Sequence, residues 1–257
     1  NLGTITDVTT TMDTHLAYQI FFASFWVGPD GNPLHPYRVI TTDDIRRGEA
    51  RPNPDLAWFL ARGDYDWLLK QAEFYCAELE REGKYTLYIW PPHCILGSEG
   101  HSLVGVIHEA RMFFSYARRA QSRIEIKGDN PLTEHYSVFR PEVVRRFDGG
   151  LLGEKNTVLV EELLSADALV IAGEASSHCV KNSINDLLDE IAARDPALAG
   201  KVYLLTDCMS PVAIPDGKGG FVADFTADAE EALRRYAQAG ARPVRSTDPV
   251  ETWPGIG

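Results

Sequence analysis

Short apolar runs rich in β-branched residues alternate along this chain with longer stretches in which apolar residues recur at helical spacing. Strands are predicted at residues 5–12, 84–90, 123–127, 167–173, 201–206 and 243–246. Helices are predicted at residues 56–82 with a break at Gly63, and at 103–121, 157–165, 179–194 and 226–240. Five prolines within residues 26–55 predict an irregular segment there. The alternation favours an α/β fold with a mostly parallel sheet.

The composition of the 257 residues is typical of a globular protein, with 44% hydrophobic and 24% charged residues. A net charge of −12 and scattered basic residues argue against nucleic-acid binding. No run of about 18 apolar residues occurs, so a membrane-spanning helix is not expected. The four cysteines lie far apart without a CxxC motif, which argues against a disulfide scaffold. We therefore expect a cytoplasmic protein whose partner is a small molecule or another protein.

The segment AGEASSHCV at residues 172–180 carries the clearest local sign of chemistry. A buried strand ends at Gly173, a tight turn follows, and Cys179 begins an amphipathic helix. A helix N-terminus favours the thiolate form of a cysteine, and its free N–H groups can bind an oxyanion. The competing interpretation is a buried cysteine that acts as a small hydrophobic residue. The position of Cys179 at the carboxyl edge of a sheet leaves both interpretations open.

Two further segments could supply metal ligands. Asp13 and His15 lie two residues apart at the end of a strand, so their side chains project to the same side. Pro91 and Pro92 fix an extended approach to His93. One carboxylate and two imidazoles are a plausible donor set for zinc, iron or manganese. A polar strand end facing water and a structural histidine are the competing interpretations.

Lys127 ends the strand at residues 123–127, directly before a Gly-Asp-Asn-Pro turn. An ammonium group directed into a pocket there could stabilise a thiolate, and an exposed lysine is the alternative. A second Gly-Lys pair occurs in PDGKGG at residues 215–220. No Ser or Thr follows that lysine, so the segment predicts a solvated turn and not a P-loop.

Taken in order, these segments resemble the isochorismatase-like cysteine hydrolases, and within them the nicotinamidases. The family pattern is Asp-x-His at a strand end, Trp-Pro-x-His-Cys, a Lys-Gly turn leading to Tyr-Ser, and Gly-x-Ala-[Thr/Ser]-x-x-Cys-Val. This chain has DTH, WPPHC, KGDNPLTEHYS and GEASSHCV in that order. The resemblance covers about residues 5–246 and implies a three-layer αβα fold. It also implies one hydrolase domain over residues 1–257, with an insertion at about 30–83.

The resemblance implies catalytic roles for individual residues. Cys179 matches the nucleophile and Lys127 matches the catalytic lysine. The backbone N–H groups of Ala175 and Cys179 match the oxyanion hole. The peptide bond between Glu174 and Ala175 matches a cis bond of the family.

The resemblance also implies the binding residues. Asp13, His15 and His93 match the ligands of a divalent metal ion, zinc in the first instance, with iron or manganese as alternatives. Trp90 and Tyr136 lie where relatives have the walls of the substrate-ring site.

The chain departs from the family pattern in three respects. Glu174 and Ser177 replace an aliphatic residue and an Asp of many relatives, and the insertion could form a lid or an interface. The third catalytic residue of the family, an Asp on a first strand, has no match, because Asp7 lies at the wrong end of its strand. We therefore expect a strand and a helix to precede Asn1.

The expected function is the hydrolysis of nicotinamide to nicotinate and ammonia by a homo-oligomer, without nucleic-acid or membrane partners. One alternative is hydrolysis of another small amide or ureide in a pocket reshaped by the insertion. A different alternative is a non-catalytic binding module on the same fold.

Overall fold

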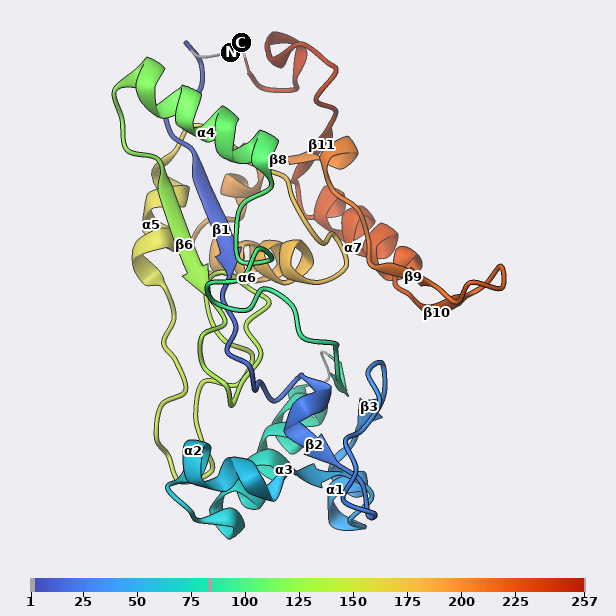
Figure 1. The fold of residues 1–257 in the computed structure, drawn as a ribbon. Coiled ribbons are helices and arrows are strands. Elements are labelled where there is room, and N and C mark those ends of the chain that lie inside the picture. Colours follow the sequence, from blue (N-terminus) through green and yellow to red (C-terminus); the bar gives the residue numbers. More distant parts are fainter. Residues whose placement is uncertain (1–2, 83–84, 257) are drawn as a thin grey trace. The chain divides into compact units, whose positions relative to one another are not determined.

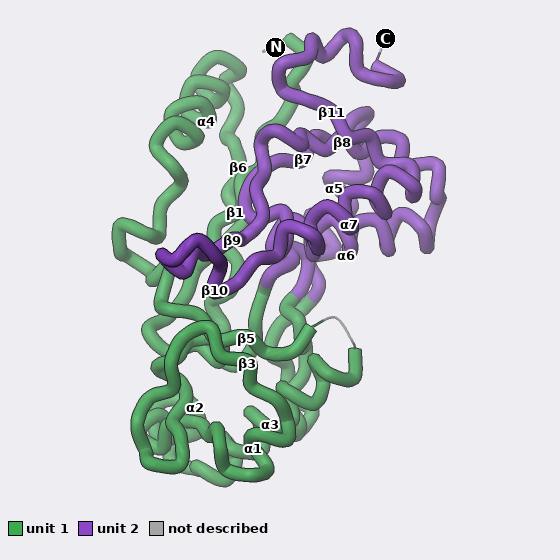
Figure 2. Tube along the Cα trace, turned by 90° about the vertical axis from the view of Figure 1, so that its right-hand side faces the viewer, with its two compact units in different colours: residues 1–135, 141–154 green, residues 136–140, 155–257 purple. Residues whose placement is uncertain are grey.

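The computed structural model describes residues 3–82 and 85–256, whose helices and strands are shown in Figure 1. The chain forms two compact units: unit 1 contains residues 1–135 and 141–154, and unit 2 contains residues 136–140 and 155–257 (Figure 2). Each unit has its own hydrophobic core and combines helices with parallel strands, so the predicted α/β class is confirmed. No helix of the described ranges is long and apolar enough to cross a membrane.

Unit 1 contains one parallel strand pair, β1 (Thr9–Asp13) with β6 (Arg123–Lys127). Two antiparallel pairs are shorter: β2 (Trp26–Val27) with β4 (Arg51–Pro52), and β3 (Val39–Ile40) with β5 (Leu87–Tyr88). The helices are α1 (Thr42–Arg46), α2 (Ala57–Ala61), α3 (Tyr65–Glu82) and α4 (Gly105–Arg118). Short 3-10 helices lie at Ala23–Phe25 and Pro54–Leu56.

The elements of unit 1 follow the predicted order, with differences in their bounds. β1 begins at Thr9 and not at residue 5, because its partner β6 begins opposite Thr9. Residue 84, in the predicted strand 84–90, lies outside the described residues. The proline-rich segment contains an unpredicted helix, α1, whose N-terminus has a capping box formed by Thr41 and Asp44. The predicted break at Gly63 is confirmed, since Gly63 has a φ of +91° between α2 and α3.

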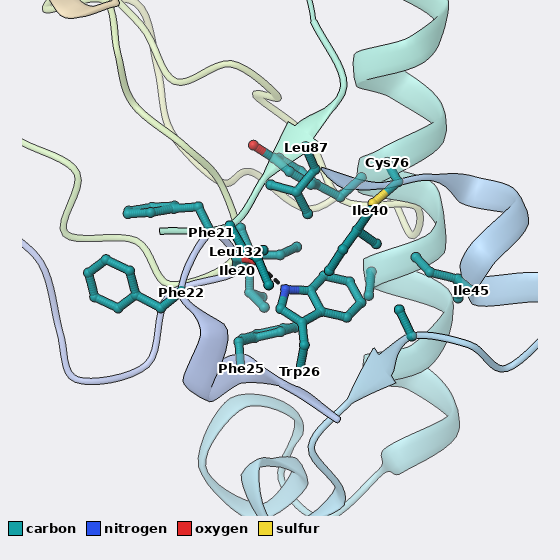
Figure 3. Packing of buried hydrophobic residues seen from close by; sticks show 14 of the residues in the cluster. Ile20, Phe21, Phe22, Phe25, Trp26, Ile40, Ile45, Cys76, Leu87 and Leu132 are labelled. Atoms are coloured by element: carbon teal, nitrogen blue, oxygen red, sulfur yellow. Dashed lines mark hydrogen bonds between the residues drawn. The ribbon is translucent and has the colours of Figure 1, made fainter. Parts of the chain in front are cut away.

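The region predicted as an insertion, about residues 30–83, supplies much of the core of unit 1 (Figure 3). Ile40 and Cys76 from this region lie in one buried cluster with Trp26. The indole N–H of Trp26 donates to the backbone oxygen of Ile20 at 2.6 Å. This region therefore packs against the segment that follows His15 in the sequence.

Unit 2 is built on the parallel sheet of β7 (Leu169–Ile171), β8 (Val202–Leu205) and β11 (Arg242–Val244), with β8 in the centre. Its helices are α5 (Thr157–Ser165), α6 (Cys179–Arg194) and α7 (Thr226–Gln238). β9 (Ala213–Pro215) and β10 (Phe221–Asp224) form an antiparallel hairpin. Short 3-10 helices lie at Pro196–Lys201, Thr206–Cys208 and Val250–Thr252.

The core of unit 2 explains why its helices could be located from the sequence. Val180, Ile184, Leu187 and Ile191 of α6 are buried in one cluster with residues of β8 and α7. The bounds of α5 and α6 are the predicted ones. The hairpin strands were not predicted, because most of their residues are exposed and show no hydrophobic alternation. Its tip is the predicted turn, in which the Asp216 carboxylate accepts two backbone N–H groups.

Candidate active site

Asp13 and Lys127 are the last residues of two neighbouring parallel strands, β1 and β6. The register places them directly opposite each other, at the edge of the sheet where α/β folds bind ligands. The Lys127 ammonium forms an ion pair with Asp13 Oδ1. It also donates a hydrogen bond to the backbone oxygen of His135 at 2.8 Å. Two groups that were identified in separate sequence motifs are therefore direct partners.

This ion pair is shielded from water. The Lys127 side chain is 3% exposed and that of Asp13 is 25% exposed. Burial alone would raise the pKa of Asp13, but the charge and hydrogen bond of Lys127, together with His15 and His93, lower the pKa overall. Asp13 is thus a carboxylate at neutral pH. The competing interpretation of Lys127 as an exposed lysine is wrong.

His15 is a buried, neutral imidazole with a fixed tautomer. Its Nδ1 lies 3.0 Å from the Gly128 carbonyl oxygen, which can only accept, so Nδ1 carries the proton. The other ring nitrogen, Nε2, is then an acceptor, and it lies 4.0 Å from Asp13 Oδ2. Burial lowers the pKa of His15, although the Gly128 hydrogen bond and the Asp13 charge oppose this. Metal-ligating histidines usually have this arrangement, with the second ring N–H donated to a carbonyl or carboxylate.

Gln19 shares the same carbonyl and was not predicted from the sequence. Its side chain is fully buried, and its Nε2 donates to the Gly128 oxygen at 3.0 Å. Among the described atoms, Gln19 Oε1 is buried without a hydrogen-bond partner. The Gly128 carbonyl therefore holds both His15 and Gln19. A single glutamine has no recognisable pattern in a sequence, so only its burial identifies it.

Gly128 leaves no room for a side chain beside His15. Its φ is +90°, and a Cβ atom there would lie 2.6 Å from His15 Cε1. We expect Gly128→Ala to displace the imidazole and to weaken divalent-metal binding by roughly 10–100-fold, the usual effect of disturbing the contacts of a ligating histidine. Calorimetric titration with zinc checks this.

A matched control separates the steric clash from backbone strain. Gly149 has a φ of +85° with open space around its Cα, so Gly149→Ala adds similar strain without touching the site. Equal losses of metal affinity in the two variants would contradict the explanation by a clash.

The segment that contains His93 runs beside His15. The backbone N–H of His15 donates to the backbone oxygen of Cys94 at 3.0 Å, and the backbone N–H of Leu96 donates to the backbone oxygen of His15 at 2.9 Å. These bonds place the His15 and His93 rings with their centroids 5.1 Å apart. His93 Nδ1 lies 2.9 Å from the backbone oxygen of Pro91, which can only accept, so Nδ1 carries a proton.

Asp13, His15 and His93 therefore present a suitable donor set for a divalent metal. Two imidazoles and a carboxylate match mixed nitrogen and oxygen sites. In a tetrahedral site, donors bound at about 2.0–2.2 Å lie about 3.3–3.6 Å apart, whereas His15 Nε2 and Asp13 Oδ2 are 4.0 Å apart. No three His, Cys, Asp or Glu residues of the described chain are close enough to hold an ion. The donor chemistry fits, and coordination would require the three groups to draw closer.

Trp90 and an unpredicted histidine complete this part of unit 1. The centroids of the Trp90 and Tyr88 rings lie 4.7 Å apart. The backbone N–H of Trp90 donates to the backbone oxygen of Phe21 at 2.7 Å. His101 Nε2 lies 2.8 Å from the hydroxyl of Thr14, the residue between Asp13 and His15. His101 was missed because it lies outside the motifs, beyond a glycine-containing turn.

Cys179 lies in unit 2 and is the first residue of α6, as predicted. The peptide bond between Glu174 and Ala175 is cis, as the resemblance implies. The Ala175 oxygen accepts the N–H groups of His178 at 3.0 Å and Val180 at 3.1 Å, which closes the turn before the helix. The Tyr136 ring lies 5.4 Å from the His178 ring. The role of the Ala175 and Cys179 N–H groups as an oxyanion hole stays a prediction.

Sequence comparison gives one partial match. No protein-family model matches the chain. Over 120 residues it is 32% identical to the nicotinamidase of Escherichia coli, a match that covers 46% of this chain and 44% of that protein. The chain thus spans less than half the length of this curated relative.

Solved structures match over most of the chain. A nicotinamidase/pyrazinamidase of Acinetobacter baumanii superposes with a TM-score of 0.53 at 18% identity, over 96% of this chain and 81% of that one. Yeast nicotinamidase gives a TM-score of 0.50 at 18% identity, over 93% and 79% of the two chains. The chain has the nicotinamidase fold. The resemblance inferred from the four motifs is confirmed for the fold. In this version of the nicotinamidase fold, Asp13 and Lys127 end strands and Cys179 begins a helix.

Proposed function

We propose that the protein is a cysteine amidohydrolase that converts nicotinamide, or a closely related small amide, to the acid and ammonia. The observation that supports this most directly is the contact of Asp13 with both Lys127 and His15 at the carboxyl ends of β1 and β6. The place of Cys179 at the start of α6 and the partial identity with a nicotinamidase support the same chemistry.

Cys179 is the proposed nucleophile. Its thiolate attacks the amide carbon, a C–S bond forms, and the carbonyl π electrons move to oxygen. The N–H groups of Ala175 and Cys179 stabilise this oxyanion. The C–N bond then breaks, and the thiol proton, carried by an acid–base group, leaves with the nitrogen as ammonia. Water hydrolyses the thioester, which releases the acid and restores the thiol.

Lys127 is the proposed catalytic lysine, whose ammonium would favour the thiolate of Cys179. Lys127 forms an ion pair with Asp13. Asp13 therefore has two proposed roles: a metal ligand, and the acid–base group that carries the thiol proton to the leaving nitrogen.

The proposed ligands of a divalent ion, zinc or else iron or manganese, are Asp13, His15 and His93. Such an ion, when bound, supplies a Lewis acid that can coordinate the ring nitrogen of a pyridine carboxamide. Trp90 and Tyr136 are the proposed walls for the ring.

His15→Ala tests the metal and the activity together. The protein is expected to bind about one equivalent of metal and to release ammonia from nicotinamide. The variant should lose most of both, because it removes a proposed ligand whose Nε2 is an acceptor and lies 4.0 Å from Asp13 Oδ2. His108→Ala is the control, since His108 is exposed on α4. Elemental analysis and an ammonia assay give the two readouts.

Three outcomes would change the proposal. Full metal content in His15→Ala would overturn the ligand assignment. Ammonia release from biuret or a ureide, but not from nicotinamide, would replace the substrate. Absence of turnover on every amide, with an unreactive Cys179, would point to a non-catalytic binding module.

A further inference from the structure

The two residues before Cys179, Ser177 and His178, are held by a part of unit 2 that the proposed chemistry does not use. That part is the hairpin base, which we define as Val212 and Phe225, the residues flanking β9 and β10. The Phe225 N–H donates to the Val212 oxygen at 3.0 Å, which closes the base. Each of its two residues contacts the turn before the nucleophile.

Val212 contacts this turn through a chain of hydrogen bonds. Its N–H donates to Ser177 Oγ at 2.9 Å, and Ser177 Oγ lies 2.8 Å from His178 Nδ1. Ser177 is only 1% exposed, so leaving either bond unmade would bury an unsatisfied group.

Phe225 contacts the turn through ring packing. Its ring meets the His178 ring edge-on, with centroids 4.7 Å apart, and Tyr136 lies 5.4 Å from the same imidazole. Burial and the nearby Lys181 lower the pKa of His178 to about 4, against the opposing charge of Asp228. The imidazole is therefore neutral at pH 7 and packs as an aromatic ring with one polar bond.

The backbone of His178 continues this arrangement into the helix. Its oxygen accepts the Asn182 N–H at 2.8 Å and the Asn182 side-chain amide at 3.0 Å. His178 thus links the hairpin base on one side to the first turn of α6 on the other. Cys179 is the residue between these two attachments.

We propose that Ser177 and His178 are positioning residues, through which the hairpin base fixes the orientation of the Cys179 thiol. The inference rests on the proposed function, because it treats Cys179 as the reacting group. It assigns the β9–β10 hairpin a role in the site, although the hairpin itself carries no catalytic group.

The test compares variants that separate the hydrogen bond from the ring packing. Ser177→Ala removes the bridging oxygen. His178→Phe keeps a ring between Tyr136 and Phe225 but removes Nδ1, and His178→Asn restores a polar atom near that position without the ring. Lys218→Ala, at the exposed tip of the hairpin, is the control.

Two readouts report on position and not on folding alone. The first is the rate of Cys179 alkylation by iodoacetamide as a function of pH, located by peptide mass analysis. Background from Cys76 and Cys94 should be slow, because burial raises the pKa of both thiols. The second is the separation of kcat from KM for amide hydrolysis. Thermal unfolding of each variant identifies any that fail to fold.

In Ser177→Ala and His178→Phe we expect the alkylation profile of Cys179 to shift and kcat to fall by about tenfold, the effect of losing one hydrogen bond. KM should change little, and His178→Asn should recover part of the loss relative to His178→Phe. Unchanged alkylation profiles and kcat in folded Ser177→Ala and His178→Phe would overturn the proposal. The alkylation profile needs no turnover, so a protein that hydrolyses no amide would refute the proposed function and still test this inference.

Discussion

Cys179→Ala is expected to reduce amide hydrolysis by at least about 10³-fold, because the variant has no group to form the covalent intermediate. The fold should persist, since the change removes one sulfur atom from a half-buried position at a helix N-terminus. Ammonia release and thermal unfolding, measured on the same preparation, check the two parts of this expectation.

Cys208→Ala is the matched control for that variant. Cys208 is also a free thiol of unit 2, but it is exposed in a 3-10 helix. It should keep full activity. Substantial turnover by Cys179→Ala, or an equal loss in Cys208→Ala, would mean that Cys179 is not the nucleophile.

Asp13→Asn is expected to have the largest effect on the proposed metal site and on its ion pair with Lys127. The amide keeps the shape of the carboxylate but removes its charge from Lys127 and from the proposed ion. We expect metal affinity to fall by roughly 10–100-fold, as for other losses in a ligand set. The metal-free protein should also lose about 1–3 kcal/mol of stability. This is below the value for breaking a fully buried ion pair, because the Asp13 side chain is 25% exposed.

Lys127→Met separates the two roles of Asp13. Removing the ammonium removes a cation that competes with a metal ion for the Asp13 carboxylate, so metal affinity should be kept or increased while amide hydrolysis is lost. Metal titration, ammonia release and denaturant unfolding of Asp13→Asn, Lys127→Met and the double variant give a complete cycle. If Asp13→Asn kept its metal but lost activity, Asp13 would be the partner of Lys127 and the proton carrier, and not a ligand.

Much of the fold could be predicted because its signals are local. The amphipathic face of α6 is formed by residues of that helix alone, and the side-chain cap of α5 by Asn156, the residue just before it. The start of β1 could not be predicted, since it depends on where β6 begins more than 100 residues later. The strands β9 and β10 could not be predicted for a different reason: most of their side chains are exposed, so their sequences show no alternation of hydrophobic and polar residues.

In the candidate site, too, the residues in sequence motifs could be predicted, and the contacts between distant residues could not. Asp13, His15, His93 and Lys127 could be named because their chemistry recurs at fixed spacing in motifs. The ion pair between Asp13 and Lys127 could not, because the register of two parallel strands is not encoded in either strand alone. Gln19 and His178 act through packing and single hydrogen bonds, and these become visible only in three dimensions.

The register of β1 and β6 also determines which changes in chain length the protein can tolerate. Adding or deleting one residue within either strand would shift the following side chains by about 3.3 Å and turn them to the opposite face. Asp13 and Lys127 would then no longer meet. The exposed tip of the β9–β10 hairpin is under no such constraint. For this protein, a single inserted codon in a five-residue strand is therefore more damaging than several inserted codons at the hairpin tip.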